Sequence, residues 1–286
     1  MTMLRPQRQM VLMIRFAIAI FALAVTSLNT TAQVLDHYYL DPQQVDKISK
    51  FRSCAGHHYG YDQIFIDLGL YEVETDPTEI NRSMKHYFAP HETLRISGSN
   101  NAVRLYAPFD GSIYRVTDEG HDSGYVNKQV WIQSSASPDT FAILFHVNLL
   151  NTFPQYWNDW PAEHWPYHGI DDEDFERLTV SSGEMIGYAD LRGTMSDIAI
   201  LKRIDTTEYH FLSYFDESVM TERLFSTYRQ YGLTNRHEVI VSREFRNANP
   251  LPDDCWGKSR NEDWFVFSTP EEVTNLPIWL LYRAAQ

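Results

Sequence analysis

The middle of the chain alternates hydrophobic and polar residues in the way that β-strands do. Residues 103–106, 112–116 and 129–133 each show this period of two, and residues 140–150 form a longer run rich in β-branched and aromatic residues. Glycines that suit turns separate these runs, at Gly111, Gly120, Gly124, Gly183, Gly187 and Gly193. The pattern predicts a strand-rich region from about residue 101 to residue 215.

The two flanking regions show a mixed pattern. On the N-terminal side, residues 43–51 are predicted to form a short amphipathic helix. On the C-terminal side, Asp216 can cap a helix that runs to about Arg229, and Ser242 can begin another. Residues 264–267 and 278–282 are the last strand candidates. The chain is therefore predicted to be mainly β with α segments (α+β), a core of antiparallel strands with N- and C-terminal α/β additions.

Residues 1–32 have the features of a secretory signal peptide. Arg5, Arg8 and Arg15 precede or flank an apolar run over residues 16–25, and small polar residues end the segment. The apolar run is short for a membrane span, although an uncleaved anchor is the alternative. We expect the protein to be exported, to the periplasm or the extracellular space, with no stable membrane span after cleavage.

The charge balance excludes one class of partner. The 286 residues include 38 acidic and 24 basic side chains, a formal charge of −14. Sequence-independent binding to nucleic acid needs clustered Lys and Arg, and no basic stripe occurs after the first residues, so no nucleic-acid partner is expected. A hydrophobic share of 43% and a charged share of 22% are ordinary for a globular protein, which excludes a disordered chain.

Two cysteines are present, Cys54 and Cys255. In an oxidising compartment a single pair is predicted to form a disulfide, here closing a loop of about 200 residues. The alternative is a catalytic thiol at Cys54, next to His57 and His58.

Three segments of the strand-rich region share one pattern, a strand that meets a tight turn. They are residues 105–113 (LYAPFDGSI), 142–149 (AILFHVNL) and 180–188 (VSSGEMIGY). In this order they resemble the β-sheet core of lysostaphin-type zinc endopeptidases (the duplicated hybrid motif), which cut peptide cross-links in bacterial cell walls. The first and third segments also occur in lipoyl and biotinyl carrier domains, and the histidine of the second favours the endopeptidases.

The resemblance covers about 110 of the 286 residues and implies a domain organisation. Residues 1–32 would be the signal peptide, and residues 33–98 an N-terminal segment packing on the core. Residues 99–215 would be the lysostaphin-like β domain, with an aromatic insertion at residues 150–175. Residues 216–286 would be a C-terminal segment of helices and strands.

The resemblance also implies a zinc site, which this sequence matches poorly. The family binds zinc through H-x-x-x-D and the second His of H-x-H, and uses the first His of H-x-H and that of Y-x-H-L for proton transfer and transition-state stabilisation. His146 matches Y-x-H-L, and His86 matches the first ligand, but Pro90 stands in place of the Asp. Asp197 and Ala199 stand in place of H-x-H, with Ala199 at the ligand position. Since catalytic zinc needs three protein ligands and one open position, zinc chemistry is predicted to be lost and no cofactor is expected.

Other histidines could rebuild a metal site. His57, His58 and His86 are candidate ligands, although neighbours on a strand point to opposite faces, so only one of His57 and His58 could act with His86. His164 and His168 are followed by acidic residues, but they come after the first resembling segment, whereas the family motif comes before it. The alternative for all of them is ordinary hydrogen bonding.

Two further features are candidate binding sites. Residues 153–168 are rich in aromatic residues, and Trp157, Trp160 and Trp165 could stack on sugar rings or anchor a partner protein. The alternative is a lid packed on its own core. Arg82, with Lys85 nearby, could hold an anionic ligand or simply be solvated.

The sequence thus indicates an exported, non-catalytic lysostaphin-like protein, a cell-envelope binding or regulatory module for peptidoglycan or a partner protein. One alternative is an active cell-wall peptidase or hydrolase with a rearranged site using His86, His146 and Asp197. Another is a structural or assembly protein with the aromatic segment as its interface.

Overall fold

The structure is a computed structural model of the chain. It describes residues 33–56, 79, 82–95, 100–120, 126–155, 157–158, 178–192, 195–204, 208–252, 254–255 and 260–268. Residues 1–32 and 33–286 separate into two units, and the features below belong to the second. In the part of the chain that is described, no helix is long and apolar enough to cross a membrane.

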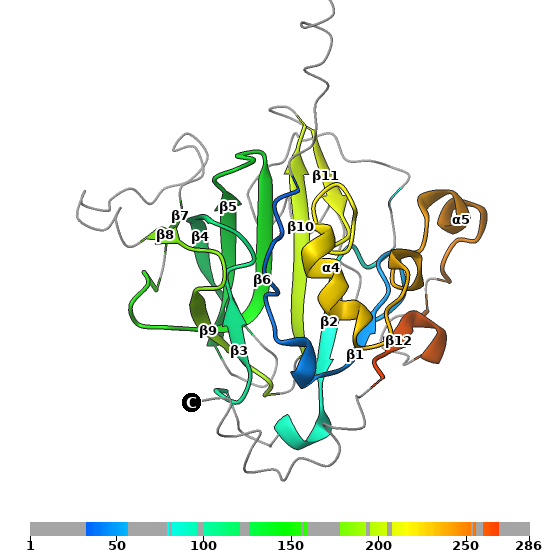
Figure 1. The fold of residues 1–286 in the computed structure, drawn as a ribbon, viewed down its shortest axis with the longest axis horizontal. Helices are drawn as coiled ribbons and strands as arrows, with labels where there is room; N and C mark the ends of the chain where they lie inside the picture. The colour runs from blue at the N-terminus through cyan, green and yellow to red at the C-terminus, as the bar shows by residue number, and fades with distance from the viewer. Residues whose placement is uncertain are drawn as a thin grey trace, which may run out of the picture. The chain divides into compact units, whose positions relative to one another are not determined.

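In the described ranges, twelve strands form one antiparallel sheet (Figure 1). Their order along the main path is β12-β1-β2-β10-β6-β5-β4-β7, with β11 beside β10, β8 beside β4, and β9 joining β3 to β6. The strands are β1 (Val45–Ser49), β2 (His86–Pro90), β3 (Arg104–Tyr106), β4 (Gly111–Gly120), β5 (Val126–Ser134), β6 (Thr140–Leu149), β7 (Trp157–Asn158), β8 (Thr179–Val180), β9 (Met185–Ala189), β10 (Ser196–Arg203), β11 (Tyr209–Leu212) and β12 (Trp264–Val266).

The alternating segments of the sequence are strands, so the mainly β class is confirmed. Residues 103–106, 112–116, 129–133 and 140–150 correspond to β3, β4, β5 and β6. Gly111 begins β4 directly opposite Ser134. An added Cβ there would lie 2.2 Å from the backbone oxygen of Gln133, so this close approach of two strands requires glycine.

The three segments that carry the resemblance lie next to one another in the sheet. The first and third pair through β3 with β9 and through β4 with β8, and the third pairs with the second through β9 and β6. The turn between β8 and β9 is tied to the first segment, because Gly183 donates a backbone hydrogen bond to Ala107 at 2.9 Å. Segments separated by up to about 80 residues thus form one patch of sheet.

Hydrophobic side chains pack on both faces of the sheet. The first core includes Phe88, Leu144, Ile198, Ile200, Phe215 and Leu224. The second core, on the opposite face, includes Trp131, Phe141, Phe145, Ala199, Leu201 and Phe211. Alternation along β10 therefore places Ile198 and Ile200 on one side and Ala199 on the other, as the sequence pattern predicted.

Among the described residues, two α-helices follow the strand region. α4 (Glu222–Arg229) begins after Thr221, whose side chain caps Leu224, and it packs Leu224, Phe225 and Tyr228 into the first core (Figure 1). Asp216 instead caps the preceding turn by accepting from the backbone of Ser218 at 2.8 Å. The predicted helix is therefore shorter at its start than expected.

The other predicted elements of the flanks have different outcomes. α5 (Arg243–Ala248) begins after Ser242, as predicted, and β12 lies within the predicted strand at residues 264–267. Residues 278–282 lie outside the described part. The predicted helix at residues 43–51 is wrong: a single 3₁₀ turn, Pro42–Gln44, leads into β1. β1 pairs with both β2 and β12, and these tertiary hydrogen bonds override the helical spacing of its apolar residues. Three further 3₁₀ turns are Glu92–Leu94, Arg236–Glu238 and Asn261–Asp263.

Cys54 and Cys255 form the predicted disulfide. Their Cα atoms are 6.0 Å apart, and both residues are buried. Cys54 follows β1 and Cys255 precedes β12, and these two strands pair with each other. The bond therefore fixes the C-terminal edge strand to the N-terminal part of the sheet.

Candidate functional site

Four ionisable side chains meet on the face of the sheet that carries the second core. Lys85 immediately precedes β2, and Asp197 lies near the start of β10, the neighbouring strand. Glu119 lies near the end of β4, and His146 lies in β6. Ion-pair contacts link Lys85 to Asp197 and link His146 to both Asp197 and Glu119. We call this group the charged quartet.

Lys85 and Asp197 form a fully buried ion pair. Their side chains are 1% and 0% exposed. The Lys85 ammonium also lies over the rings of Phe145 and Tyr87, 4.1 and 4.8 Å from their centroids, where cation–π attraction favours it. Burial by itself would lower the pKa of Lys85, but the charge of Asp197 outweighs it and raises this pKa above its ordinary value. The lysine is therefore charged at neutral pH.

His146 reaches the quartet because β6 contains a bulge. Its φ of 55° lies in the left-handed region, and the register of β5 with β6 shifts between Lys128 and Val130. Its backbone N–H donates to Glu119 Oε2 at 2.9 Å, which holds the bulge in place. Its ring lies with Nδ1 3.2 Å from Glu119 Oε2 and Nε2 3.8 Å from Asp197 Oδ1.

Glu119 and His146 form the more accessible half of the quartet. The Glu119 and His146 side chains are 21% and 14% exposed. Burial raises the pKa of Glu119, and the charges of His146 and Lys85 only partly oppose that effect. A carboxyl group with a raised pKa beside an imidazole can exchange protons with it, so this half has the chemistry of a proton relay.

His86 lies on the opposite face of the sheet from the quartet. It follows Lys85 directly, and neighbours on a strand point to opposite sides. Its Nδ1 lies 2.7 Å from the carbonyl oxygen of Ser49 and its Nε2 2.7 Å from Ser213 Oγ, so both ring nitrogens are hydrogen bonded. Burial lowers the pKa of His86 to about 4, which keeps it neutral. The predicted grouping of His86, His146 and Asp197 is therefore corrected: two of the three meet, and His86 is separate.

The residues present do not fit the zinc ion that the resemblance implies. His86 is turned to the other face, and Pro90 has no donor atom. Ala199 offers only a methyl group, and Lys85 places a positive charge against the carboxylate of Asp197. Across the described ranges, no three or more His, Cys, Asp or Glu side chains are grouped so as to hold a metal ion. These observations concern the donor set itself, and we derive no chemical step through a metal.

The other residues that the sequence predicted for binding or for metal coordination do not belong to the charged quartet. Arg82 is buried and donates to Glu79 at 2.8 Å and to Asn247 at 3.0 Å, so it holds β2 and α5 together. The backbone of Trp157 lies in β7, opposite Val116 of β4. The other candidates, His57, His58, Trp160 and Trp165, lie outside the described residues.

Sequence reasoning missed two members of the quartet. From the sequence, Lys85 is predicted only as part of an anion site, and Glu119 is not among the predicted site residues. The signal for Lys85 is a charged residue directly before the apolar strand β2, where it must be buried and paired. Glu119 gives no such signal, because the bulge at His146 brings the two together.

Comparisons with known proteins give little. No family model matches the chain, and no curated protein does. Among solved structures, Helicobacter pylori Csd3 shares 14% identity at a TM-score of 0.27, covering 64% of this chain and 39% of that one. This chain thus spans well under half of the Csd3 chain. A similarity at this TM-score carries no argument about fold or function.

Proposed function

We propose that this protein is an exported, non-catalytic lysostaphin-like module that binds peptidoglycan in the cell envelope. The observation that carries the proposal is the Lys85–Asp197 ion pair. Asp197 matches the first position of the family's H-x-H motif, and the cation it contacts is an ammonium group belonging to the chain itself.

The electrostatics of this pair support a loss of zinc catalysis. A divalent ion placed beside Asp197 would lie close to the buried ammonium of Lys85, and in a poorly solvated interior the repulsion between two cations is large. The pair also uses the negative charge that would otherwise attract such an ion. Asp197 thus has a cationic partner within the chain itself, and the carboxyl group of Glu119 contacts His146.

Two observations support export. Residues 1–32 have the pattern of a secretory signal peptide. The buried disulfide between Cys54 and Cys255 is typical of proteins that fold in an oxidising compartment. Both are compatible with a place in the periplasm or outside the cell.

The binding proposal is tested with purified sacculi. The chain, exported with its own leader, is mixed with sacculi and sedimented, and the supernatant is analysed for released muropeptides with and without added Zn²⁺. We expect co-sedimentation without release in either case. Zinc-dependent release would overturn the non-catalytic assignment, and failure to sediment would overturn binding.

The aromatic segment provides a site-directed version of this test. If Trp157 and Trp160 stack on sugar rings, replacing both with Ala should weaken sacculus binding by about tenfold or more, since an aromatic stack contributes about 1 kcal/mol each. Trp264→Ala is the matched control, because Trp264 lies in β12 and contacts Lys47. Equal binding by the double variant would remove the stacking role.

A metal-independent hydrolase is the second candidate function. The contact between Glu119 and His146 favours it, because a carboxylate beside an imidazole can hold that ring as a general base for water. This candidate predicts muropeptide release that persists in a chelator and is lost in His146→Gln. Release with these properties would replace the non-catalytic proposal.

A further inference from the structure

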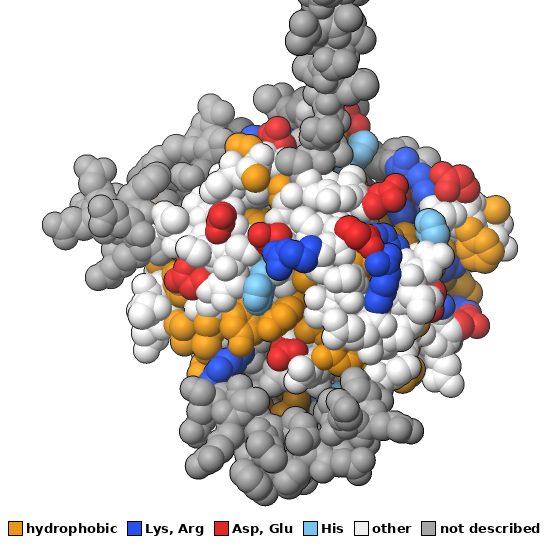
Figure 2. All heavy atoms as spheres, in the orientation of Figure 1, with side chains coloured by type: hydrophobic (Ala, Val, Ile, Leu, Met, Phe, Trp, Pro, Cys, Tyr) orange, Lys and Arg blue, Asp and Glu red, His pale blue; other side chains and the backbone are white. Residues whose placement is uncertain are grey.

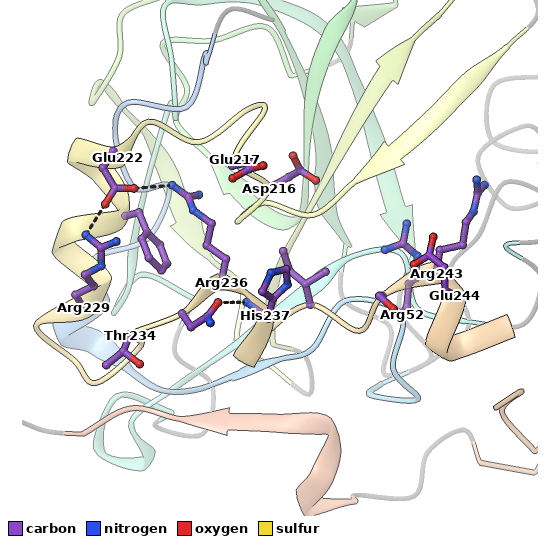
Figure 3. Close-up of a pocket in the computed structure, with 14 residues that line it drawn as sticks. Arg52, Asp216, Glu217, Glu222, Arg229, Thr234, Arg236, His237, Arg243 and Glu244 are labelled. Atoms are coloured by element: carbon purple, nitrogen blue, oxygen red, sulfur yellow. Dashed lines mark hydrogen bonds and ion pairs between the residues drawn. The ribbon is translucent and has the colours of Figure 1, made fainter. Parts of the chain in front are cut away.

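A pocket of about 670 Å³ lies away from the charged quartet, in the C-terminal part of the chain. Its lining comes from the turn before α4, from α4 and the turn that follows it, and from the start of α5, together with Arg52 after β1 (Figure 3). A volume of this size is in the usual range for sites that bind small molecules. None of the residues singled out by sequence analysis as candidate ligands or catalysts lines it.

One end of the pocket is basic. Arg52 and Arg243 line it there, and both contact the buried carboxylate of Glu79, Arg52 at 2.8 Å and Arg243 at 3.1 Å. Arg82 contacts the same carboxylate at 2.8 Å. The four side chains carry a net charge of +2, and exposed Glu244 at this end reduces it to +1.

Arg52 is held firmly at this end. Its φ of 61° is unusual for a residue other than glycine. Backbone hydrogen bonds fix it: its N–H donates to Ser83 at 2.8 Å, and its carbonyl accepts from Arg246 Nε at 2.8 Å. Its guanidinium is ordered as well, because it donates to Glu79 at 2.9 Å and to the carbonyl oxygen of Val241 at 3.3 Å. A guanidinium that is already ordered loses little entropy when it binds an anion.

Acidic side chains lie along another side of the pocket. Asp216 and Glu217 lie next to each other, between the basic end and the Glu222 end (Figure 3). Glu222 is paired with Arg229 and with Arg236 at 3.2 Å, so that end is internally neutralised. Glu217 is exposed, and it lines the pocket next to Asp216.

The charges are balanced as well as separated. Four arginines and four acidic residues line the pocket, as the lining residues show. On the face seen in Figure 2, acidic and basic side chains likewise lie close together instead of forming a patch of one sign. A polyanion such as a nucleic acid would be repelled by the acidic side, and a cation by the basic end. A small ligand that carries one positive and one negative group can contact the acidic side with the first and the basic end with the second.

We propose that this pocket binds a free amino acid or a short peptide in its zwitterionic form. The carboxylate lies at Arg52 and Arg243, whose planar guanidinium groups suit a carboxylate, and the ammonium lies at Asp216 and Glu217. The pocket volume of about 670 Å³ suits a ligand of this size, because sites that bind small molecules have about 300–1,000 Å³. This function is separate from sacculus binding and does not depend on it.

Three probes separate the two charges. Trialanine carries both, N-acetyl-trialanine lacks the ammonium, and trialanine amide lacks the carboxylate. Ligand-observed NMR titrations with the full chain at low salt should show saturable binding of trialanine, with each blocked probe weaker by about tenfold or more, because each loses a charge-assisted contact. Equal binding of all three, or no saturable binding, overturns the proposal.

Two variants assign each charge to its side chains. In Arg243→Gln the preference for trialanine over its amide should fall by about tenfold, while the preference over the N-acetyl form remains. In Glu217→Gln the pattern should reverse. The matched controls are Arg223→Gln and Glu208→Gln, whose side chains are outside the pocket and should change neither preference.

The proposal can still be tested if Arg243→Gln does not fold properly. Arg243 contacts Glu79, so Arg243→Gln is checked by thermal unfolding before use. Glu217→Gln removes an exposed carboxylate, and together with the three probes on the unchanged chain it tests the proposal alone. Preferences that do not respond to Glu217→Gln would place the ammonium elsewhere and overturn the assignment.

Discussion

Lys85 and Asp197 form a buried ion pair between neighbouring strands, at positions that are offset by two residues in the register of β2 with β10. Asp197 lies opposite Tyr87, so the long lysine side chain runs along the sheet to reach it. A buried ion pair stabilises the fold less than its contact suggests, but removing one partner is costly because a charge is left unpaired in the interior.

Asp197→Asn should therefore be strongly destabilising. It leaves the Lys85 ammonium buried without its counter-charge, and we expect the free energy of unfolding to fall by about 3–5 kcal/mol. Urea denaturation measures this. The control is Asp139→Asn, which breaks an exposed pair with Arg203 and should cost less than about 1 kcal/mol. The double variant Lys85→Met/Asp197→Leu should recover most of the loss, and a cost near zero for Asp197→Asn alone would contradict the pairing.

Stability should depend on pH through His86. Burial lowers the pKa of His86 in the folded protein to about 4, below its ordinary value of 6.5, so the unfolded chain binds a proton first as the pH falls. The stabilisation is complete above pH 6.5 and is lost as the pH falls toward 4. The shift corresponds to about 3 kcal/mol, since one pKa unit is about 1.4 kcal/mol.

The variant His86→Gln isolates this effect. Its unfolding free energy should fall less between pH 6.5 and pH 4 than that of the unchanged chain, while the contribution of carboxylates is common to both. His210→Gln serves as the control. His210 lies in β11, and its partly exposed ring contacts Glu208, which immediately precedes this strand. Identical pH slopes in His86→Gln and in the unchanged chain would show that His86 is not a buried neutral histidine.

Glu79→Gln should destabilise the region around α5. Glu79 is 2% exposed and is the shared partner of Arg52, Arg82 and Arg243, so the amide leaves three guanidinium groups facing one another. We expect a loss of about 3 kcal/mol in urea denaturation and faster hydrogen exchange in α5. Glu92→Gln is the matched control, because its carboxylate is 89% exposed. Unchanged exchange in α5 would argue against this role.

Reduction of the disulfide should destabilise the whole sheet. The bond between Cys54 and Cys255 spans 201 positions, and in the chain-entropy model a loop of this length contributes about 5 kcal/mol, with measured values of about 2–5. Thermal unfolding with and without reductant measures the loss. Cys54→Ser/Cys255→Ser should match the reduced protein and be insensitive to reductant, and equal midpoints for all forms would refute the contribution.

Much of the fold could be predicted from local pattern. Period-two alternation located β3 to β6 and assigned the faces of β10 correctly, because each half-buried strand repeats one rule over several residues. The helix expected at residues 43–51 failed because the apolar spacing of Val45, Ile48 and Phe51 fits a helix as well as a strand. Pairing with β2 and β12 makes this segment a strand, and no local signal in the sequence reveals that pairing.

The candidate site was predictable only in part. Asp197 and His146 were identified by resemblance, and they do lie together. His86 was placed with them although it lies on the opposite face, since a shift of one residue reverses every side chain of a strand. The bulge at His146 and the contact of Glu119 with that histidine depend on how β4, β5 and β6 align with one another. The sequence of any one of these strands does not specify that alignment.

The disulfide has a practical consequence for handling the protein. Nearly the entire sheet lies between Cys54 and Cys255 in the sequence, so a protease that cuts one exposed connection there yields two pieces that stay covalently joined. Such a nicked molecule would migrate as one species on a denaturing gel without thiol and as two with it. A gel run with thiol is therefore needed to show whether a preparation is intact.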